Sequence, residues 1–162
     1  MTLVQLSLKL PNRPGALAAI ARLLAEARIN LAAISVDSLG RVGNVRLIVN
    51  DPSRAKSLLE EGGYAVEQQE MLAVRLEDRA GSFLKVLEVL AEAHVNIRSV
   101  AILVAREGPH SMVGLFTDDP SKARRLLTDA GFVSEKTERL VSNADLLAAA
   151  PAIPAESVGF LL

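Results

Sequence analysis

The sequence predicts an α+β protein that contains two copies of a βαββαβ unit paired side by side. Three observations predict this fold class: an internal repeat, alternating apolar residues where strands are expected, and apolar residues at helical spacing between them. With 162 residues, the chain is long enough for one ordinary domain or two small ones. The repeat decides in favour of two.

The internal repeat consists of two segments that each occur twice. Residues 12–30, NRPGALAAIARLLAEARIN, match residues 78–96, DRAGSFLKVLEVLAEAHVN, at 7 of 19 positions. Residues 51–64, DPSRAKSLLEEGGY, match residues 119–132, DPSKARRLLTDAGF, at 7 of 14 positions. Two copies of one folding unit explain this better than a single domain, because a repeat of this length reflects a structural period.

The repeat also sets the expected domain boundaries. The copies are offset by 66 residues in the first segment and by 68 in the second, so the second copy contains two additional residues. We expect this insertion in a hairpin loop near Gly108. The expected units are residues 1–68 and 69–141, and residues 142–162 form a C-terminal tail.

Each copy begins with a strand. Apolar side chains at positions 4, 6, 8 and 10 alternate with polar ones, which is the period of a half-buried strand, and Leu72, Val74 and Leu76 repeat the pattern. The other strands are expected at 31–38, at 44–50 and from Tyr64 in the first copy, and at 97–105, at 111–118 and from Phe132 in the second.

Two helices are expected in each copy. Apolar residues at i, i+3 and i+7 mark the inner face of the first helix. These residues are Leu17, Ile20 and Leu24 in one copy and Phe83, Val86 and Leu90 in the other. The second helix follows Asp51–Pro52 or Asp119–Pro120, a capping carboxylate before a proline suited to the first helical position. Gly63 and Gly131 fit the left-handed residue just beyond its end.

This order of elements is the ferredoxin-like arrangement, with an antiparallel sheet and helices on one face. A unit of about 66 residues is only marginally stable alone, so the copies are expected to share an interface. We expect them to pair through their second strands into one continuous antiparallel sheet. Residues 97–104 would otherwise form a long apolar edge that invites aggregation.

Composition excludes several classes of function. The chain has 18 basic and 19 acidic residues, a net charge of -1, which gives no electrostatic reason to expect nucleic acid or a membrane as partner. It has no cysteine, so disulfides and thiolate chemistry are excluded. The first residues, MTLVQLSLKLP, alternate like a strand and do not resemble a signal peptide. We expect a cytoplasmic protein.

The loop between the first strand and first helix of each copy is the most informative segment. Residues 12–15 read NRPG and residues 78–81 read DRAG. Glycine lets the backbone approach a ligand closely, and the N–H groups at a helix N-terminus suit a carboxylate. The alternative is a plain strand-to-helix turn with an Asx cap. Asn30 and Asn96 directly follow this helix in the two copies, where they serve either a shared site or only helix termination.

These residues resemble the ACT family of small amino-acid-sensing domains. The matching motifs are the [N/D]-R-x-G loop, the LAEA-x-[I/V]-N helix end and the DPS-x-A-x-x-LL second helix. The resemblance covers nearly the whole chain except the tail, and it is greatest to stand-alone proteins of two ACT units without a catalytic domain. It implies that free amino acids bind where the loop of one unit meets the helix–strand junction of the other.

The resemblance implies two non-equivalent ligand sites. The first would combine Asn12, Gly15, Ala16 and Leu17 with Asn96, and the second Asp78, Gly81, Ser82 and Phe83 with Asn30. In each, backbone amides would hold the carboxylate and the Asn or Asp side chain the α-amino group. The second loop has Ala80 where the family usually has proline.

The resulting hypothesis is a non-catalytic regulator that binds amino acids, with no cofactor or metal, and that forms a homodimer. An enzyme is disfavoured because the only two histidines, His94 and His110, lie at no recognisable catalytic spacing. RNA binding would need aromatic residues on the third strands, where only Phe116 is found. The open alternative is a regulatory small subunit or antagonist that acts by contact on an amino-acid biosynthetic enzyme or a transcription regulator.

The sequence of the C-terminal tail indicates little regular structure. Residues 144–150 form a short apolar helix candidate, and prolines follow at positions 151 and 154. The chain end is either disordered or packs Phe160 and Leu162 on a sheet face or a second subunit.

Overall fold

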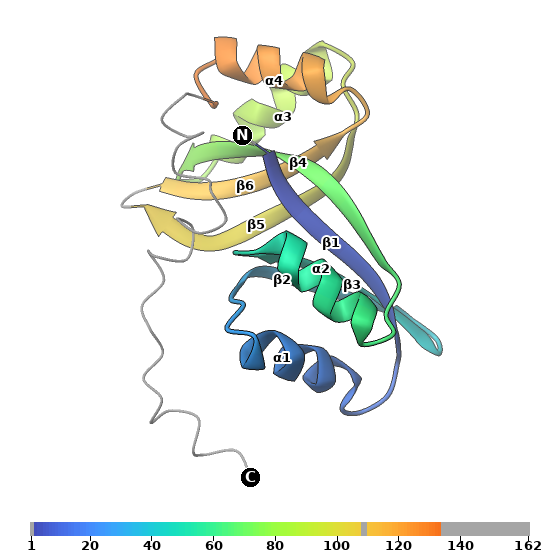
Figure 1. Cartoon of the computed structure of the whole chain (residues 1–162). Helices are drawn as coiled ribbons and strands as arrows, with labels where there is room; N and C mark the ends of the chain where they lie inside the picture. Colours follow the sequence, from blue (N-terminus) through green and yellow to red (C-terminus); the bar gives the residue numbers. More distant parts are fainter. Residues whose placement is uncertain (1, 108–109, 134–162) are drawn as a thin grey trace.

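The computed structural model describes residues 2–107 and 110–133 (Figure 1). The elements are β1 (Thr2–Pro11), α1 (Ala16–Glu26), β2 (Leu31–Leu39), β3 (Val42–Val49), α2 (Pro52–Glu61), β4 (Val66–Glu77), α3 (Ser82–Glu92), β5 (Ile97–Glu107), β6 (His110–Thr117) and α4 (Pro120–Asp129). The tail helix candidate, the Phe160 and Leu162 contacts and the continuation of the last expected strand lie outside the described residues.

The strands form one antiparallel sheet. Its order is β2-β3-β1-β4-β6-β5, and every neighbouring pair is antiparallel. The predicted α+β fold of two βαββαβ units in one continuous antiparallel sheet is therefore confirmed, and the described residues contain six strands and four helices. Glu107 lies opposite His110, so the expected hairpin joins β5 and β6.

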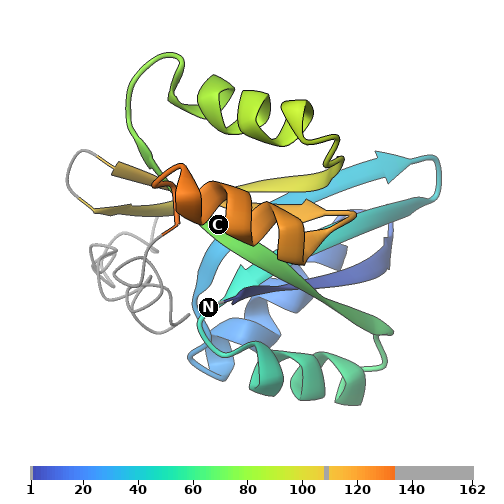
Figure 2. The same cartoon turned by 90° about the horizontal axis from the view of Figure 1, so that it is seen from above.

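A single long strand joins the two units. The first part of β4 pairs with β1, with Val66 opposite Leu8, and the second part pairs with β6, with Glu77 opposite His110. Figure 2 shows β4 running across the molecule from one unit to the other. The boundary expected between residues 68 and 69 thus falls inside this strand.

The prediction that the units pair through their second strands is wrong. β2 and β5 are the two edge strands of the sheet; they lie close to each other but form no ladder. The physical reason lies in residues 65–77, which contain no Gly, Pro, Asn or Asp. Without a turn residue, the fourth strand of the first unit continues directly into the first strand of the second.

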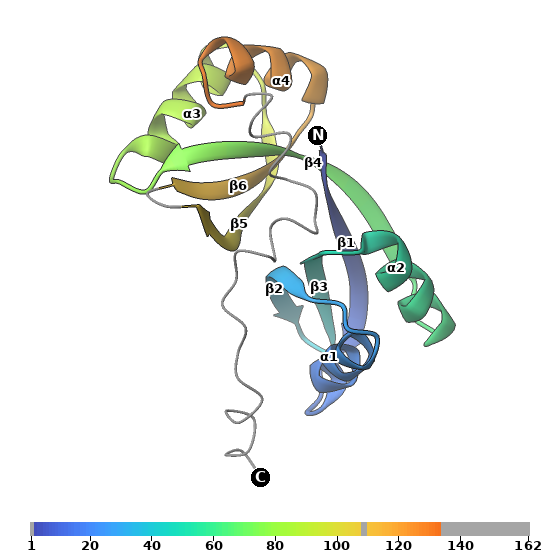
Figure 3. The same cartoon turned by 60° about the vertical axis from the view of Figure 1, so that its left-hand side comes forward.

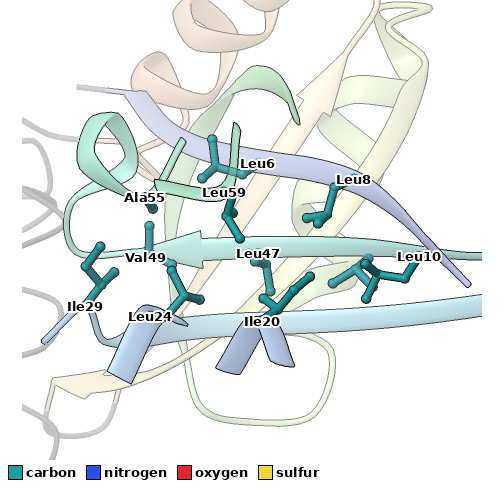
Figure 4. Packing of buried hydrophobic residues seen from close by; sticks show 11 residues of the cluster. Leu6, Leu8, Leu10, Ile20, Leu24, Ile29, Leu47, Val49, Ala55 and Leu59 are labelled. Carbon is teal, nitrogen blue, oxygen red and sulfur yellow. The ribbon is translucent and has the colours of Figure 1, made fainter. Parts of the chain in front are cut away.

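The helices cover one face of this sheet, as predicted. On β4, Leu72 and Val74 point to the same side as the helices of the second unit, and α1 and α2 cover the first unit. Figure 4 shows the core of the first unit, to which β1 contributes Leu6 and Leu8 and α1 contributes Ile20 and Leu24. The two helix pairs lie on opposite outer sides of the molecule (Figure 3).

The opposite face of the sheet is also buried, because the sheet folds onto itself. Its core contains residues from both units: Leu3, Ala32, Ile48, Met71, Ala73, Leu103 and Met112. Each of these side chains is at most 5% exposed. The two units consequently share a hydrophobic core in addition to a strand, which the repeat alone did not predict.

The predicted helix caps are present in both copies. The Asp51 carboxylate accepts a hydrogen bond from the Arg54 N–H at 3.0 Å, and the Asp119 carboxylate accepts one from the Lys122 N–H at 2.9 Å. Beyond these helices, Gly63 and Gly131 adopt the expected left-handed conformation, with φ of 85° and 80°. No helix of the described residues is long and apolar enough to cross a membrane.

Removal of a cap should weaken the protein measurably. We expect Asp119→Ala to lower the free energy of unfolding by about 1 kcal/mol, because the Lys122 N–H loses its acceptor. Urea denaturation measures this loss. Asp129→Ala is the matched control: this aspartate lies at the negative end of the same helix, so its removal should leave stability unchanged or slightly raised. Equal losses of stability in both variants would contradict the role of Asp119 as a helix cap.

Candidate functional site

The loops before α1 and α3 have the same backbone. Gly15 and Gly81 both have φ of 84° and immediately precede the helices. Neither helix has a side-chain N-cap bond. In the first loop, the Asn12 side-chain amide instead donates to the Gly40 carbonyl at 2.9 Å, in the turn between β2 and β3. The alternative of a turn with an Asx cap is therefore wrong for the first loop.

The first turn of α3 leaves backbone donors available. The N–H of Ser82 donates to Arg79 and that of Lys85 to Gly81, both within the turn. The N–H groups of Phe83 and Leu84 form no backbone bond within the described residues. Together with the positive end of the helix dipole, they provide the arrangement that binds a carboxylate.

The left-handed glycines give a direct stability test. Gly81→Ala should lower the free energy of unfolding by roughly 1–2 kcal/mol, because an alanine is strained at positive φ although no atom lies within 4 Å of the added Cβ. The control is Gly43→Ala, whose φ is not positive and whose nearest atom lies at 3.6 Å. Thermal denaturation compares them. A loss at Gly43 as large as that at Gly81 would contradict the backbone explanation.

A pocket of about 310 Å³ lies beside the second loop, and it brings three of the predicted site residues together. Asp78, Ser82 and Phe83 line it on the loop side. Strands β5 and β6 supply the facing wall, mainly Val100, Ile102 and Val113. The pocket thus combines charged side chains, Asp78 with its neighbours Glu77 and Arg79, and the first turn of α3 with an apolar wall. This arrangement can hold a small molecule with charged and apolar parts.

Asn30 and Asn96 occupy a different place from the one predicted for a ligand contact. The Asn30 N–H donates to the Asn50 side chain at 3.1 Å, and the Asn96 N–H donates to the Asp118 carboxylate at 3.0 Å. Both residues are exposed and neither lines the 310 Å³ pocket, whose walls come from the second unit alone. The cross-unit combinations of Asn30 and Asn96 with the loops remain predictions.

These bonds identify residues that the sequence reasoning missed. Asn50 and Asp118 directly follow the third strand of each unit, and each closes a reciprocal pair by donating its own N–H to the carbonyl of Asn30 or Asn96. Their equivalent positions in the repeat were the available signal. The left-handed residues after α1 and α3 are Arg28 and His94, with φ of 57° and 55°, so the asparagines do not themselves form that turn.

The first loop is more open than the second. Asn12 and Gly15 are exposed, Ala16 is half-buried and the Leu17 side chain is 38% exposed. Where the second unit places Phe83 over its pocket, the first has only Leu17. Within the described residues no group of three or more His, Asp or Glu side chains could hold a metal ion.

Fold and site together define a tandem pair of ferredoxin-like units with a glycine loop before the first helix of each. The family model described as "ACT domain pair" matches residues 1–141. The chain therefore belongs to the ACT domain pair family, as its motifs predicted.

Solved structures support the fold. Protein BT0572 from Bacteroides thetaiotaomicron is 25% identical with a TM-score of 0.78, and the match covers 90% of this chain and 96% of that one. The regulatory subunit of aspartate kinase from Thermus thermophilus is 18% identical with a TM-score of 0.59, covering 79% and 92%. Aspartokinase alpha and beta subunits are 20% identical with a TM-score of 0.55, covering 80% and 93%. No curated protein matches the sequence.

Proposed function

We propose that this protein is a non-catalytic regulator that binds free amino acids and senses their level. The observation that carries the proposal is the 310 Å³ pocket at Asp78, Ser82 and Phe83. Membership of the ACT domain pair family supports it. The fold shared with the regulatory subunit of aspartate kinase is consistent with an allosteric role.

The chemistry of the pocket matches the two ends of an amino acid. The N–H group of Phe83 donates to the ligand carboxylate, and the Asp78 carboxylate accepts from the α-amino group. Val100 and Val113 then face the side chain of the ligand, which favours amino acids with aliphatic side chains. Near-zero net charge suits a zwitterionic ligand.

Exposed apolar side chains of β5 line the pocket, and a second copy of the chain can cover them. Val100 is 43% exposed and Ile102 is 74% exposed, and the equivalent Ile34 and Val36 on β2 are also about half exposed. Burying such rows against a second copy removes apolar surface and covers two sheet edges. A homodimer is therefore part of the proposal.

A thermal-shift screen of the twenty amino acids tests the ligand class. A ligand that binds only the folded state at 100 times its dissociation constant adds about 2.7 kcal/mol to stability. We expect aliphatic amino acids to raise the melting temperature and lysine and glutamate to leave it unchanged. No shift with any amino acid at millimolar concentration would reject the proposal.

Regulation by contact with an enzyme or transcription regulator is the second candidate function. The observation that favours it is the apolar surface on the helices, where Leu84 is 55% exposed in addition to the exposed row on β5. Affinity purification of the tagged protein with and without the bound amino acid tests it. A specific partner whose recovery changes with the amino acid would support sensing and contact together, whereas purification of the protein alone under both conditions would reject contact.

A further inference from the structure

A separate cleft lies at the seam between the two units, where β5 of the second unit runs beside β2 of the first without a ladder (Figure 3). Its volume is about 310 Å³, and β1, β2, β3 and β5 all contribute to its walls. This seam cleft has Val100 and Ile102 in common with the amino-acid pocket, whereas its other lining residues do not line that pocket. We propose that the seam cleft binds a small aliphatic carboxylate that has no amino group.

The floor of the seam cleft contains a buried amide. Gln5 is 3% exposed and lies directly opposite Ile48, which is 1% exposed. The Gln5 Nε2 donates to the Gln69 Oε1 at 3.4 Å, which is longer than the roughly 2.7–3.2 Å of an ordinary N–H···O bond. Because a primary amide has both donors and an acceptor, Gln5 can bind a polar group of a ligand that enters the cleft.

The charge of the lining favours an anion. Among the described residues that line the seam cleft, Arg46 alone is charged. Its Nη1 donates to the Asp37 carboxylate, but this ion pair is open to solvent and competes only weakly with a ligand for the remaining N–H groups. A ligand amino group would find no counter-charge in this lining, whereas the amino-acid pocket supplies Glu77 and Asp78. The seam cleft therefore favours a carboxylate without an amino group.

The apolar walls of the seam cleft accommodate a short hydrocarbon chain. Ala33 of β2 and Ala101 of β5 line it from the two facing strands, and their small side chains leave the space between the strands free. Ile34 adds a larger apolar side chain that is 49% exposed. Ser35 lies directly opposite Arg46, so the polar end of the cleft adjoins these walls. A branched aliphatic chain fits between them and removes apolar surface from water.

The internal repeat separates these features from the requirements of the fold. At the offsets of 66 and 68 residues, Gln5 and Arg46 correspond to Met71 and Gly114 of the second unit. Both units have the same order of elements. The fold therefore needs neither an amide nor a cation at these positions, and their presence in the first unit favours a role in binding.

Calorimetric titration of the full chain with isovalerate tests the inference, and isovaleramide is the matched neutral ligand. We expect isovalerate to bind with an affinity that falls as NaCl is raised, because salt screens its attraction to Arg46. Isovaleramide should bind roughly tenfold more weakly or not at all, because it lacks the charge. Absence of isovalerate binding at tens of millimolar, or equal affinities for the two ligands, would overturn the inference.

Two variants place the carboxylate in the seam cleft. Arg46→Met should weaken isovalerate binding by roughly tenfold or more, the size expected for a lost charge-assisted hydrogen bond. Gln5→Met, which introduces the residue type of the second unit, should weaken it by a smaller factor. Arg22→Ala on the exposed side of α1 removes the same charge outside the cleft and should bind normally. Unchanged affinity in Arg46→Met, or an equal loss in Arg22→Ala, would overturn the inference.

Binding of aliphatic amino acids is measured on the same samples. Arg46→Met should retain it, and Asp78→Ala should retain isovalerate binding, because neither residue lines the other cavity. Failure of this inference and failure of the proposed function are therefore distinguishable.

Discussion

Leu3→Ala is expected to lower the free energy of unfolding by about 2–5 kcal/mol. Leu3 is fully buried and packs with Met71 on the face of the sheet away from the helices. Truncating it leaves a cavity at the contact between the two units, where Ile48 of the first unit and Met112 of the second also meet. Chemical denaturation measures the loss.

The same experiment tests whether the units fold together. Because this core contains side chains of both units and β4 belongs to both, we expect one cooperative transition that moves as a whole in Leu3→Ala. Leu84→Ala on the exposed side of α3 is the control and should change stability little. Two separate transitions, of which only one moves, would show that the units fold independently.

Asp78→Ala is expected to weaken amino-acid binding by roughly ten- to a hundredfold, because a charge-assisted bond to the α-amino group contributes about 1.5–3 kcal/mol. The residue is exposed at the pocket, so the loss should appear directly in the measured affinity. Calorimetric titration with the amino acid that gives the largest thermal shift measures it.

Two further variants separate the roles of the two loops. Asp78→Asn retains an acceptor without the charge and should bind with intermediate affinity. Asn12→Ala changes the equivalent position of the first loop, where the side chain is held by Gly40, and should reduce binding at the second pocket little. Equal losses for Asn12→Ala and Asp78→Ala would contradict the assignment of the pocket to the second loop.

The sequence predicted the helices and most strands within a few residues because the repeat doubled every local signal, although the strands expected from Tyr64 and around Val74 form the single strand β4. The alternation in the first strand, the apolar spacing of Ile20 and Leu24 and the cap of Asp51 depend on neighbours close in the chain. Such local preferences survive in the folded protein when tertiary packing agrees with them. The left-handed glycines beyond α2 and α4 were predictable for the same reason, since positive φ at Gly63 and Gly131 is a local requirement for ending a helix.

Long-range arrangement was less predictable. An apolar edge at residues 97–104 needs cover, but the sequence did not show that the sheet would fold onto itself and place β5 beside β2 without a ladder. The core around Leu3 and Met71 depends on that folding, because its residues come from segments that are far apart in the chain. Likewise, the hydrogen bond between the Arg75 and His110 side chains joins residues 35 positions apart.

The most direct test of amino-acid sensing is an NMR titration of the isotopically labelled full chain with each of the twenty amino acids. We predict that an aliphatic amino acid shifts the backbone amide resonances of Gly81, Phe83 and Leu84 saturably, with smaller changes at Val100. Resonances of Asp129 at the end of α4, which does not line the pocket, should not move. Amide resonances at the loop that stay unchanged with every amino acid at millimolar concentration would contradict a sensor of free amino acids.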